Sequence, residues 1–417
     1  MKTHRANPRR CPLFIICLMS TSVLAQWPQW GGPNRDFKSD AKGLAAKWPD
    51  DGPKRVWSRP LGDGLSSIAM DDGKLFTMYR DGEEEVVIAI DASTGKTVWQ
   101  NRYAAVVPSG VETRFGVGPR STPTIAGDRV YTLGIAGMLQ CTRKKDGKTV
   151  WSHDLIKAFG AKSPEFGFAS SSTVYQGKLI VAGGGKGNGI MAFDLVSGSV
   201  VWRKHDFENV YSSPVVINVD GQDQIVLLVD RELVAVNPDN GNLLWRRDHA
   251  NQWKTNISTP VWGSDGLLYT TSGGDAGSRV LKLARKDGKT DPKEVWAHRK
   301  ASVGQGNVVR VGNHFYGCAG YGPNSFLAVV HAETGEMAWR ERGFAKGMIV
   351  YGDGKLIVLD EGGTLTLVKA SPKSFEVLSS FKLFDLGEEK NSWTLPILVG
   401  KRLYARDNDT IVALDLG

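Results

Sequence analysis

The sequence predicts an all-β fold: an eight-bladed β-propeller of four-stranded antiparallel blades, its ring closed by N- and C-terminal strands in one blade. Three observations lead to this prediction. One short phrase, seen most cleanly as AIDASTGKTVWQ at residues 89–100, is repeated along the 417-residue chain. Its tryptophans are roughly 42 to 52 residues apart, which is the spacing of propeller blades. Half copies at 54–60 and 410–417 together make one complete copy, as expected when the two ends of a chain close a ring.

Each copy of the phrase predicts a hairpin. At residues 89–100 an alternating apolar strand runs into Asp91, turns on a short segment containing Gly95, and returns through Trp99. Alternation with a period of two on both sides of such a turn is typical of two antiparallel strands. A weaker copy at 365–381 has Leu378 about where the tryptophan is expected. The other copies occupy residues 139–154, 190–206, 233–249, 280–299 and 326–342.

A second pair of strands precedes each phrase. Its first strand opens on small hydroxyl residues, a tight turn follows, and a second apolar strand such as KLFTMYR comes next. Together with the phrase, this pair makes a four-stranded unit. A β-sandwich of many short strands is the alternative, but it explains neither the regular period nor the split copy. The eight units are predicted to start near Ser66, Ser121, Ser171, Ser212, Ser258, Gly306, Lys346 and Trp393.

The first 25 residues are predicted to be an export signal. Basic residues precede a short apolar run, and small residues precede a cleavage site after Ala25. No stretch is long and apolar enough to cross a membrane, so we expect an exported protein, periplasmic or secreted, without a transmembrane segment. The signal carries four of the 52 Lys and Arg residues, which leaves 48 against 44 acidic residues. Because these charges are interleaved, nucleic acid is not an expected partner.

The chain after the signal is predicted to have two parts. Residues 26–53 are rich in Pro, Gly and Trp and show no convincing helix or strand. We expect them to form an extended N-terminal segment along the folded body, with Trp27, Trp30 and Trp48 as anchors. Residues 54–417 are expected to form a single propeller domain.

The cysteines and histidines are expected to be structural. Cys141 and Cys318 lie in apolar strand patterns, in the second and sixth units, on opposite sides of the ring. Buried thiols without a disulfide are therefore expected, because a disulfide needs Cα atoms within about 7 Å. No Cys/His cluster has zinc spacing, and no metal site is predicted. Four histidines that follow repeat tryptophans are expected on solvated outer strands: His153, His205, His249 and His298.

The repeated pattern Ala-x-Asp-x-x-Thr-Gly-x-x-x-Trp resembles the tryptophan-docking repeat of the PQQ-like (pyrroloquinoline-quinone repeat) eight-bladed propellers of exported bacterial proteins. The Trp-Pro-x-Trp-x-Gly-Pro opening at 27–33 is similar to members described as polyvinyl-alcohol-dehydrogenase-like or BamB-like. In that family the tryptophan packs on the neighbouring blade, where an indole supplies apolar area and one N–H donor. The resemblance implies a structural docking role for Trp57, Trp99, Trp151, Trp202, Trp245, Trp296 and Trp339.

The resemblance leaves two classes of function open. One is a quinone-dependent alcohol or polyol dehydrogenase, which holds PQQ at the channel axis with calcium, carboxylate and Asn ligands and an adjacent-cysteine disulfide. This chain has no Cys-Cys pair, and Glu112 and Glu165 are the clear acids in the loops that open the blades. Calcium requires several oxygen ligands. The preferred interpretation is a binding or scaffold module without a bound quinone, similar to the BamB propeller, and PQQ with calcium is the alternative.

The ligand of such a module is expected at one mouth of the central channel, where the loops that enter each blade converge. These loops combine aromatic residues such as Phe115, Phe166 and Tyr211 with Arg, Lys and Asn. That mixture suits a protein, peptide or carbohydrate of the cell envelope, bound by a monomer. No pattern of residues identifies a catalytic group. The candidate ligand-binding residues are Glu112, Arg114, Arg120, Trp253, Lys254, Asn307, Lys346 and Trp393.

Overall fold

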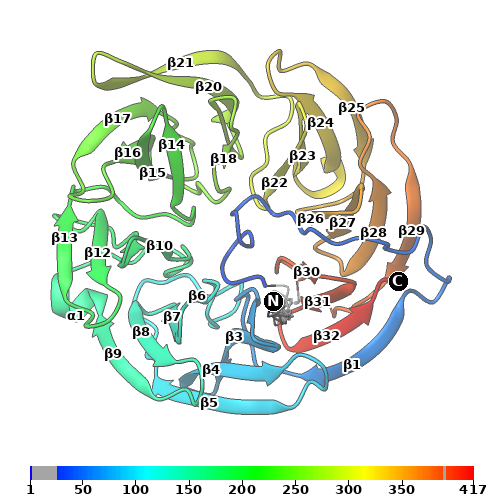
Figure 1. The fold of residues 1–417 in the computed structure, drawn as a ribbon, viewed down its shortest axis with the longest axis horizontal. Coiled ribbons are helices and arrows are strands. Elements are labelled where there is room, and N and C mark those ends of the chain that lie inside the picture. Colours follow the sequence, from blue (N-terminus) through cyan, green and yellow to red (C-terminus); the bar gives the residue numbers. More distant parts are fainter. Residues whose placement is uncertain (2–25, 388–390) are drawn as a thin grey trace.

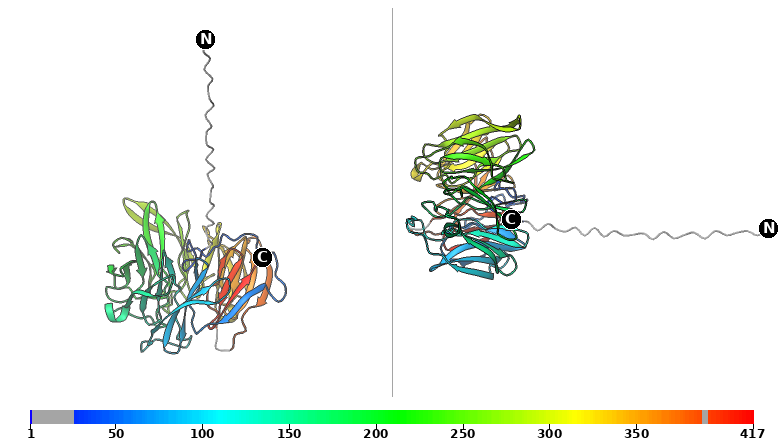
Figure 2. Two further views of the ribbon diagram at one scale, coloured as in Figure 1. Left: turned by 60° about the horizontal axis from the view of Figure 1, so that its bottom comes forward. Right: turned by 90° about the vertical axis from the view of Figure 1, so that its left-hand side faces the viewer.

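Eight four-stranded antiparallel sheets stand around a central channel, which confirms the predicted eight-bladed propeller (Figure 1). The computed structural model describes residue 1, residues 26–387 and residues 391–417. The predicted export signal and its cleavage site fall on residues 2–25, outside the described residues. In side view the blades form a flattened disc (Figure 2). Within the described ranges, the helices are too short to cross a membrane.

The blades are numbered here in chain order, and each has its first strand nearest the channel and its last at the rim (Figure 1). Blade 1 contains β2 (Ala69–Asp71), β3 (Lys74–Asp81), β4 (Glu84–Asp91) and β5 (Thr97–Ala104). Blade 2 contains β6 (Thr124–Ala126), β7 (Arg129–Leu133), β8 (Met138–Arg143) and β9 (Thr149–Asp154), followed by α1 (Leu155–Phe159). Blade 3 contains β10 (Thr173–Tyr175), β11 (Lys178–Val181), β12 (Ile190–Asp194) and β13 (Val200–Lys204). Blade 4 contains β14 (Val215–Val219), β15 (Gln222–Leu228), β16 (Glu232–Val236) and β17 (Leu243–Asp248).

The second half of the ring follows the same order. Blade 5 contains β18 (Val261–Trp262), β19 (Leu267–Ser272), β20 (Gly277–Lys286) and β21 (Lys289–His298). Blade 6 contains β22 (Val308–Val311), β23 (His314–Ala319), β24 (Phe326–His331) and β25 (Met337–Arg342), with η1 (Gly322–Asn324) between β23 and β24. Blade 7 contains β26 (Met348–Gly352), β27 (Lys355–Leu359), β28 (Thr364–Lys369) and β29 (Val377–Lys382). Blade 8 contains β30 (Ile397–Val399), β31 (Arg402–Arg406), β32 (Thr410–Asp415) and, at the rim, β1 (Lys54–Pro60).

Blade 8 closes the ring with strands from both ends of the chain. β1 pairs antiparallel with β32, from Lys54 opposite Asp415 to Pro60 opposite Thr410. This pairing confirms that the two half copies of the repeated phrase belong to one blade. The closure adds β1, the strand that precedes the first complete blade, to the outer edge of β32, so the ring is held by backbone hydrogen bonds between the two ends of the chain.

A buried arginine fastens blade 8 to blade 1. Arg406 on β31 is fully buried, and its Nη1 donates to Met78 O at 2.8 Å and to Thr77 Oγ1 at 3.0 Å. Its Nη2 donates to Gly64 O at 2.8 Å. Burial lowers the pKa of Arg406 to about 10, so the guanidinium is charged at neutral pH. Arg406 therefore satisfies blade 1 carbonyls at the closing seam rather than facing the channel.

Neighbouring blades meet where an indole covers a glycine. The Nε1 of Trp99 on β5 donates to Lys144 O in the outer turn of blade 2, at 2.9 Å. Gly147 of the same turn has φ +69°, and a Cβ built on it would lie 2.4 Å from the Trp99 ring. Only glycine fits, because it tolerates this left-handed φ and has no atom to collide with the indole. The same close approach joins Trp57 to Gly95, Trp151 to Gly198, Trp202 to Gly241, and Trp296 to Gly335.

Three seams depart from this pattern. Trp339 donates to Ser371 O of blade 7 at 2.9 Å, in an outer turn that contains no glycine. Trp245 donates to Gln224 Oε1 of its own blade at 2.7 Å, and Gln224 Nε2 donates to Thr290 Oγ1 of blade 5 at 2.6 Å. In blade 7 the bulge in the β28–β29 pairing places Ser379, not Leu378, opposite Leu367, where the other blades have tryptophan. The expectation for Leu378 is therefore wrong by one residue.

Trp48 of the N-terminal segment lies beside that substituted position. Its backbone N–H donates to Ser379 Oγ at 2.7 Å, and its ring packs edge-on against Phe381 at 5.9 Å. The indole is 4% exposed, so blade 7 obtains its buried tryptophan from outside the repeat. Cys141 and Cys318 are likewise buried, and neither forms a disulfide.

The N-terminal segment, residues 26–53, crosses one end of the channel before it reaches the rim (Figure 1). Trp27 exchanges two backbone hydrogen bonds with Met70 of blade 1. Further along, the Arg35 guanidinium donates to Ser172 O of blade 3 and to Pro214 O of blade 4. The backbone then pairs with blade 7 at residues 38, 39 and 351. This crossing lies on the side where the first and second strands of each blade are joined.

We predict that Gly147→Ala destabilises the propeller by about 3 kcal/mol, because the methyl group adds a clash with Trp99 to the strain of a left-handed residue. The matched control is Gly127→Ala in the same blade, where φ is +58° but no atom lies within 4 Å of the added Cβ. That control should lose only about 1 kcal/mol. Urea unfolding followed by circular dichroism measures both values, and equal losses would contradict the role given to the indole contact.

Arg406→Leu is predicted to lower the free energy of unfolding by about 3–5 kcal/mol, because it leaves the carbonyls of Met78 and Gly64 buried without a donor. Arg402→Leu, on the same strand, removes a partly exposed ion pair with Asp415 and should cost at most about 1 kcal/mol. Thermal unfolding of both variants tests this. Similar melting temperatures for the two would show that Arg406 does not fasten the closing seam.

Candidate ligand-binding site

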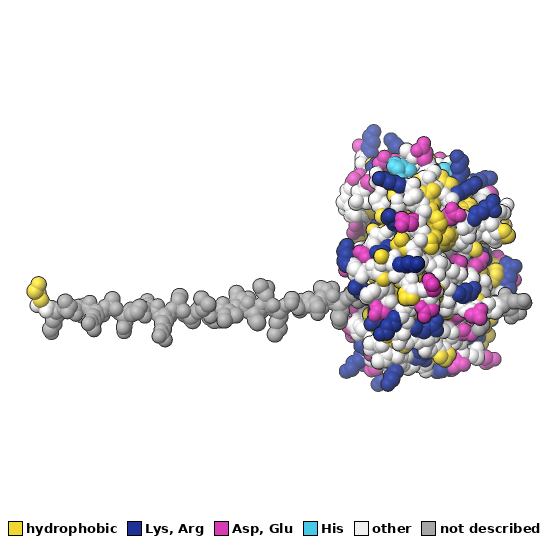
Figure 3. All heavy atoms as spheres, turned by 90° about the vertical axis from the view of Figure 1, so that its right-hand side faces the viewer, with side chains coloured by type: hydrophobic (Ala, Val, Ile, Leu, Met, Phe, Trp, Pro, Cys, Tyr) yellow, Lys and Arg dark blue, Asp and Glu magenta, His cyan; other side chains and the backbone are white. Residues whose placement is uncertain are grey.

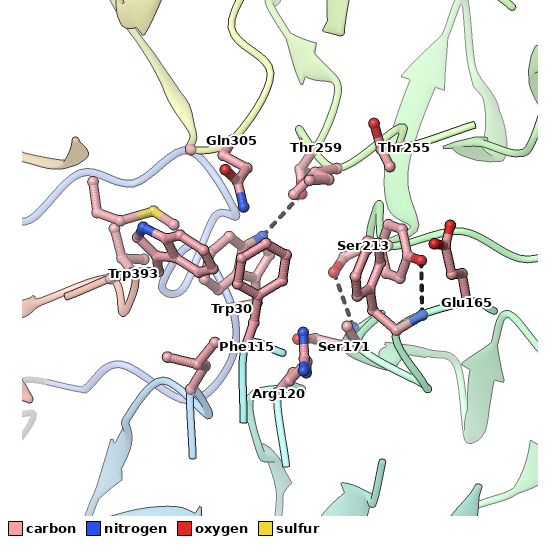
Figure 4. A pocket seen from close by; sticks show the side chains of 18 of the residues that line it. Trp30, Phe115, Arg120, Glu165, Ser171, Ser213, Thr255, Thr259, Gln305 and Trp393 are labelled. Carbon is pink, nitrogen blue, oxygen red and sulfur yellow. Dashed lines mark hydrogen bonds between the residues drawn. The ribbon is translucent and has the colours of Figure 1, made fainter. Parts of the chain in front are cut away.

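A cavity of about 530 Å³ lies at one end of the channel. The entering loops gather at this end. Each entering loop is the segment that leads from the rim strand of one blade to the inner strand of the next. We call this end the mouth. All eight blades contribute to the wall, with one residue from each being Leu65, Arg120, Ser171, Ser213, Thr259, Gly306, Met348 and Leu395 (Figure 4).

Trp30 of the N-terminal segment also lines this cavity. Its Nε1 donates to Thr259 Oγ1 of blade 5 at 2.9 Å, and its ring packs edge-on against Phe37 at 5.4 Å. Because the segment crosses the far end of the channel, Trp30 reaches the cavity from the side opposite the mouth. The sequence marks Trp30 only as an anchor, and no local signal in residues 26–53 indicates that its indole belongs to the site.

Aromatic rings from four blades form one connected wall of the cavity. Phe115 lies 5.0 Å from Trp393 and 5.5 Å from Phe166, centroid to centroid. Phe166 lies 6.0 Å from Tyr211, whose hydroxyl accepts a hydrogen bond from the Phe166 backbone N–H. Edge-to-face and tilted contacts of this kind hold the rings in place while leaving apolar faces toward the cavity.

A second aromatic pair stands across the mouth. Trp253 and Tyr321 pack at right angles with centroids 5.4 Å apart, and both line the cavity. They are 46% and 37% exposed, which is high for large aromatic side chains. The mouth therefore presents apolar rings to solvent, as ligand sites do.

Two arginines accompany the aromatic wall. The Arg114 guanidinium lies over Phe115 at 5.0 Å and over Phe166 at 5.3 Å. Arg120 Nη2 donates to Gly116 O at 2.9 Å, while its buried Nε has no hydrogen-bond partner among the described residues. Burial lowers the pKa of Arg120. Neither arginine forms an ion pair with a carboxylate of the described chain.

Four of the eight candidate residues line the cavity, and four lie elsewhere. Arg114, Arg120, Trp253 and Trp393 are in the wall. Asn307 is fully buried and exchanges hydrogen bonds with the backbone of Ile349, so it joins blade 6 to blade 7 instead of facing the channel.

The remaining candidates act on the loops around the cavity. Glu112 Oε1 accepts from the Arg114 backbone N–H at 2.9 Å and so shapes the loop that carries Arg114 and Phe115. Lys346 lies 4.4 Å from the Trp393 ring and pairs with Glu361 at 2.8 Å, behind the wall. Lys254 lines a smaller neighbouring cavity.

A buried histidine supports the loop that carries Trp253. The expectation of a solvated histidine is wrong for His249, which is 1% exposed. Ser272 Oγ donates to Asn256 Oδ1, so the 3.0 Å contact between His249 Nε2 and Ser272 Oγ assigns the ring hydrogen to Nε2. Nδ1 is buried without a partner, and burial together with Arg279 lowers the pKa of His249 to about 3.

Comparison with known proteins identifies the family. A family model described as "Outer membrane protein assembly factor BamB" matches residues 42–291 and again residues 135–375. The chain belongs to this family. BamB of Yersinia pestis is 22% identical over 245 residues, which cover 53% of the chain and 56% of that protein. Quinohemoprotein alcohol dehydrogenase ADH IIB of Pseudomonas putida is 30% identical over 123 residues, 28% of the chain and 17% of the enzyme.

Solved structures of BamB and of quinoprotein enzymes share the fold. BamB from Moraxella catarrhalis superposes with a TM-score of 0.59 at 16% identity, over 87% of this chain and 97% of that one. Quinohemoprotein alcohol dehydrogenase from Comamonas testosteroni superposes with a TM-score of 0.66 at 15% identity, over 94% and 81%. At these identities the likeness establishes the propeller alone. The chain spans about half the length of the Yersinia relative and less of the Pseudomonas enzyme.

The donor set of the cavity does not fit a calcium–quinone centre. Among the described residues that line it, Glu165 is the one carboxylate. The described part of the chain contains no group of three or more His, Cys, Asp or Glu side chains placed to hold a metal ion. Calcium is held by six to eight oxygen atoms, with carboxylates among them. This BamB-family cavity offers mainly apolar rings, hydroxyls and guanidinium groups in their place.

His249 predicts a pH dependence of stability. The folded protein binds the proton of His249 less tightly than the unfolded chain does, so the free energy of unfolding is fully retained above pH 6.5 and falls as the pH drops toward 3. The loss should approach 1.4 kcal/mol per pH unit within that window. His249→Gln should flatten the slope between pH 6.5 and 4.5 in urea unfolding. The same slope in the variant and the wild type would contradict this assignment.

Proposed function

We propose that this BamB-family chain is an exported, periplasmic or secreted binding module. It acts as a monomer and holds a protein, peptide or carbohydrate ligand of the cell envelope at the mouth of its channel. The observation that carries the proposal is the cavity itself, about 530 Å³ on the axis of the ring, with an aromatic wall and two unpaired arginines. Concave, largely apolar sites with a few polar groups are the usual form of ligand pockets.

The aromatic wall supports binding more directly than catalysis. Phe115, Phe166 and Trp393 come from three different entering loops and contact one another, and the Trp393 indole also donates to Glu361 Oε2 of blade 7 at 3.2 Å. Aromatic and arginine side chains supply much of the affinity at protein interfaces, because they bury a large area with few flexible bonds. The name of the relatives, outer membrane protein assembly factor, supports a protein or peptide ligand over the other classes.

Nucleic acid is not proposed as a partner. Figure 3 shows positively and negatively charged side chains mixed over the face it presents, without a continuous basic surface. A nucleic-acid-binding surface gathers Lys and Arg along the path of the phosphates. The cations at the mouth are few and stand among aromatic rings, which suits a discrete ligand rather than a polyanion.

A quinone-dependent alcohol or polyol dehydrogenase is the alternative, and the local similarity to the Pseudomonas putida enzyme is the observation that favours it. Against it stands the donor set, which supplies one carboxylate where a calcium ion needs several oxygen ligands. We therefore propose that neither PQQ nor calcium is a resident cofactor of this chain.

One experiment separates the two functions. The purified protein is titrated with PQQ and calcium, followed by absorbance and by dye reduction with alcohols, and with arrayed envelope peptides and oligosaccharides. We expect no stoichiometric quinone uptake, and peptide or saccharide retention that Phe115→Ala weakens about tenfold. Phe375→Ala, which removes a phenylalanine packed on Trp339 at the rim of the ring, is the matched control. Quinone binding with turnover would overturn the proposal.

A further inference from the structure

We propose that the ligand of the mouth is an extended peptide segment in which a large apolar side chain, best an aromatic one, is flanked by acidic residues. This inference rests on the proposed function and specifies its ligand. Three features carry it: the unpaired arginines of the wall, the apolar depth of the cavity, and a second cavity that continues from the first.

The charge of the wall favours an anionic group. Arg114 and Arg120 line the cavity and neither is paired with a carboxylate of the described chain, while Glu165 is the single acid among the lining residues. Arginine binds carboxylates through two parallel hydrogen bonds, which are stronger than neutral ones. A ligand carboxylate is therefore the natural partner of these guanidinium groups.

The guanidinium of Arg120 is fixed in a position where it can bind such a carboxylate. Its single hydrogen bond, from Nη2 to Gly116 O, fixes the guanidinium without neutralising it. Nε is buried and has no partner among the described residues. Burial is the largest influence on the pKa of Arg120 and lowers it although Asp63 acts in the opposite direction, so the charge is incompletely compensated and an incoming anion relieves that cost. The side chain thus gains more from an acidic ligand than an exposed arginine would.

The apolar depth of the cavity favours a large hydrophobic side chain beside the acid. Below the rings of Phe115 and Phe166 the wall continues with Leu65, Ile257 and Leu395. The opposite end is closed by the Trp30 indole, which is fixed by its bond to Thr259. An aromatic side chain entering from the mouth would contact rings on its faces and aliphatic groups at its tip.

A second cavity explains why the ligand is an extended chain rather than a small molecule. It measures about 210 Å³ and shares Glu165 and Tyr211 with the first. Apart from Pro164 and Val210 its other lining residues are polar, with Lys162 paired to Glu208 at 2.6 Å. In an extended peptide, side chains two positions apart lie on the same face at about 7 Å. One such side chain can fill each cavity, with Tyr211 between them.

The test uses capped heptapeptides and calorimetric titration of the purified full chain. The probe is acetyl-Gly-Glu-Ser-Phe-Ser-Glu-Gly-amide, in which both Glu side chains lie two positions from Phe and therefore on the same face. Its counterparts carry Lys in place of both Glu residues, or Ala in place of Phe, and phenylacetate and cellohexaose serve as the small-molecule and saccharide probes. We expect the acidic Phe peptide to bind at least tenfold tighter than every counterpart, with an affinity that falls as salt rises.

Arginine variants locate the effect. Arg120→Lys and Arg114→Gln should each weaken the acidic peptide by about tenfold and leave the Lys peptide unchanged. Arg340→Gln is the matched control, since Arg340 also lies over a phenylalanine ring, 5.5 Å from Phe326, but on the rim strand of blade 6. It should bind as the wild type does. Thermal unfolding shows that the variants remain folded.

The outcomes distinguish this inference from the proposed function. If the Lys and Glu peptides bind equally, or the arginine variants bind as the wild type does, the acidic preference is wrong while a binding function at the mouth stands. If phenylacetate or cellohexaose binds as tightly as the peptide, the ligand is not an extended peptide. If no probe binds in a manner that depends on Phe115, both the inference and the proposed function fail.

Discussion

The ring depends on the contact between an indole of one blade and a turn glycine of the next. A single four-stranded blade cannot bury its own apolar face, so it is stable only against its neighbours. The indole supplies the apolar cover, and its N–H finds a carbonyl in the same turn, as Trp99 finds Lys144 O. Glycine is required there for two reasons: it adopts the left-handed backbone conformation, and it has no side chain to collide with the indole ring. Everything at the mouth is positioned by blades that this contact holds in order.

The exceptions show which part of the contact is essential. At Trp245 the side chain of Gln224 accepts a hydrogen bond from the indole N–H and donates another to Thr290 of the next blade. At Ser379 the repeat has lost its tryptophan, and Trp48 approaches from outside the repeat. A buried indole is kept in both places, and at Trp245 its N–H also keeps an acceptor, while the identity of the partner changes. Each seam between blades requires a buried apolar contact, and more than one set of residues can provide it.

The sequence predicts the fold well because the signal is local and repeated. Period-two strands, the glycine turn and the split copy at the termini each appear within a few residues of the chain, and they give the eight blades and their closure. The site is harder, since entering-loop residues are polar for different reasons. Asn307 and Arg120 are both polar residues near the start of a blade, so the sequence does not distinguish their roles. In the structure Asn307 joins two blades, whereas Arg120 lines the cavity. The position of Trp30 in the cavity could not be predicted from neighbouring residues, because it depends on the path of the whole N-terminal segment.

That path has a consequence for how the ligand proposed for the mouth would move. The N-terminal segment spans the channel from blade 1 to blade 7, and Trp30 stands on the axis above it. The propeller is therefore a cup rather than a tunnel. A polypeptide that entered at the mouth would meet the Trp30 indole and the N-terminal segment at the other end of the channel. Chain ends, bent loops and single side chains are the shapes that fit such a cup, and the proposed ligand would leave past the aromatic rings at the mouth.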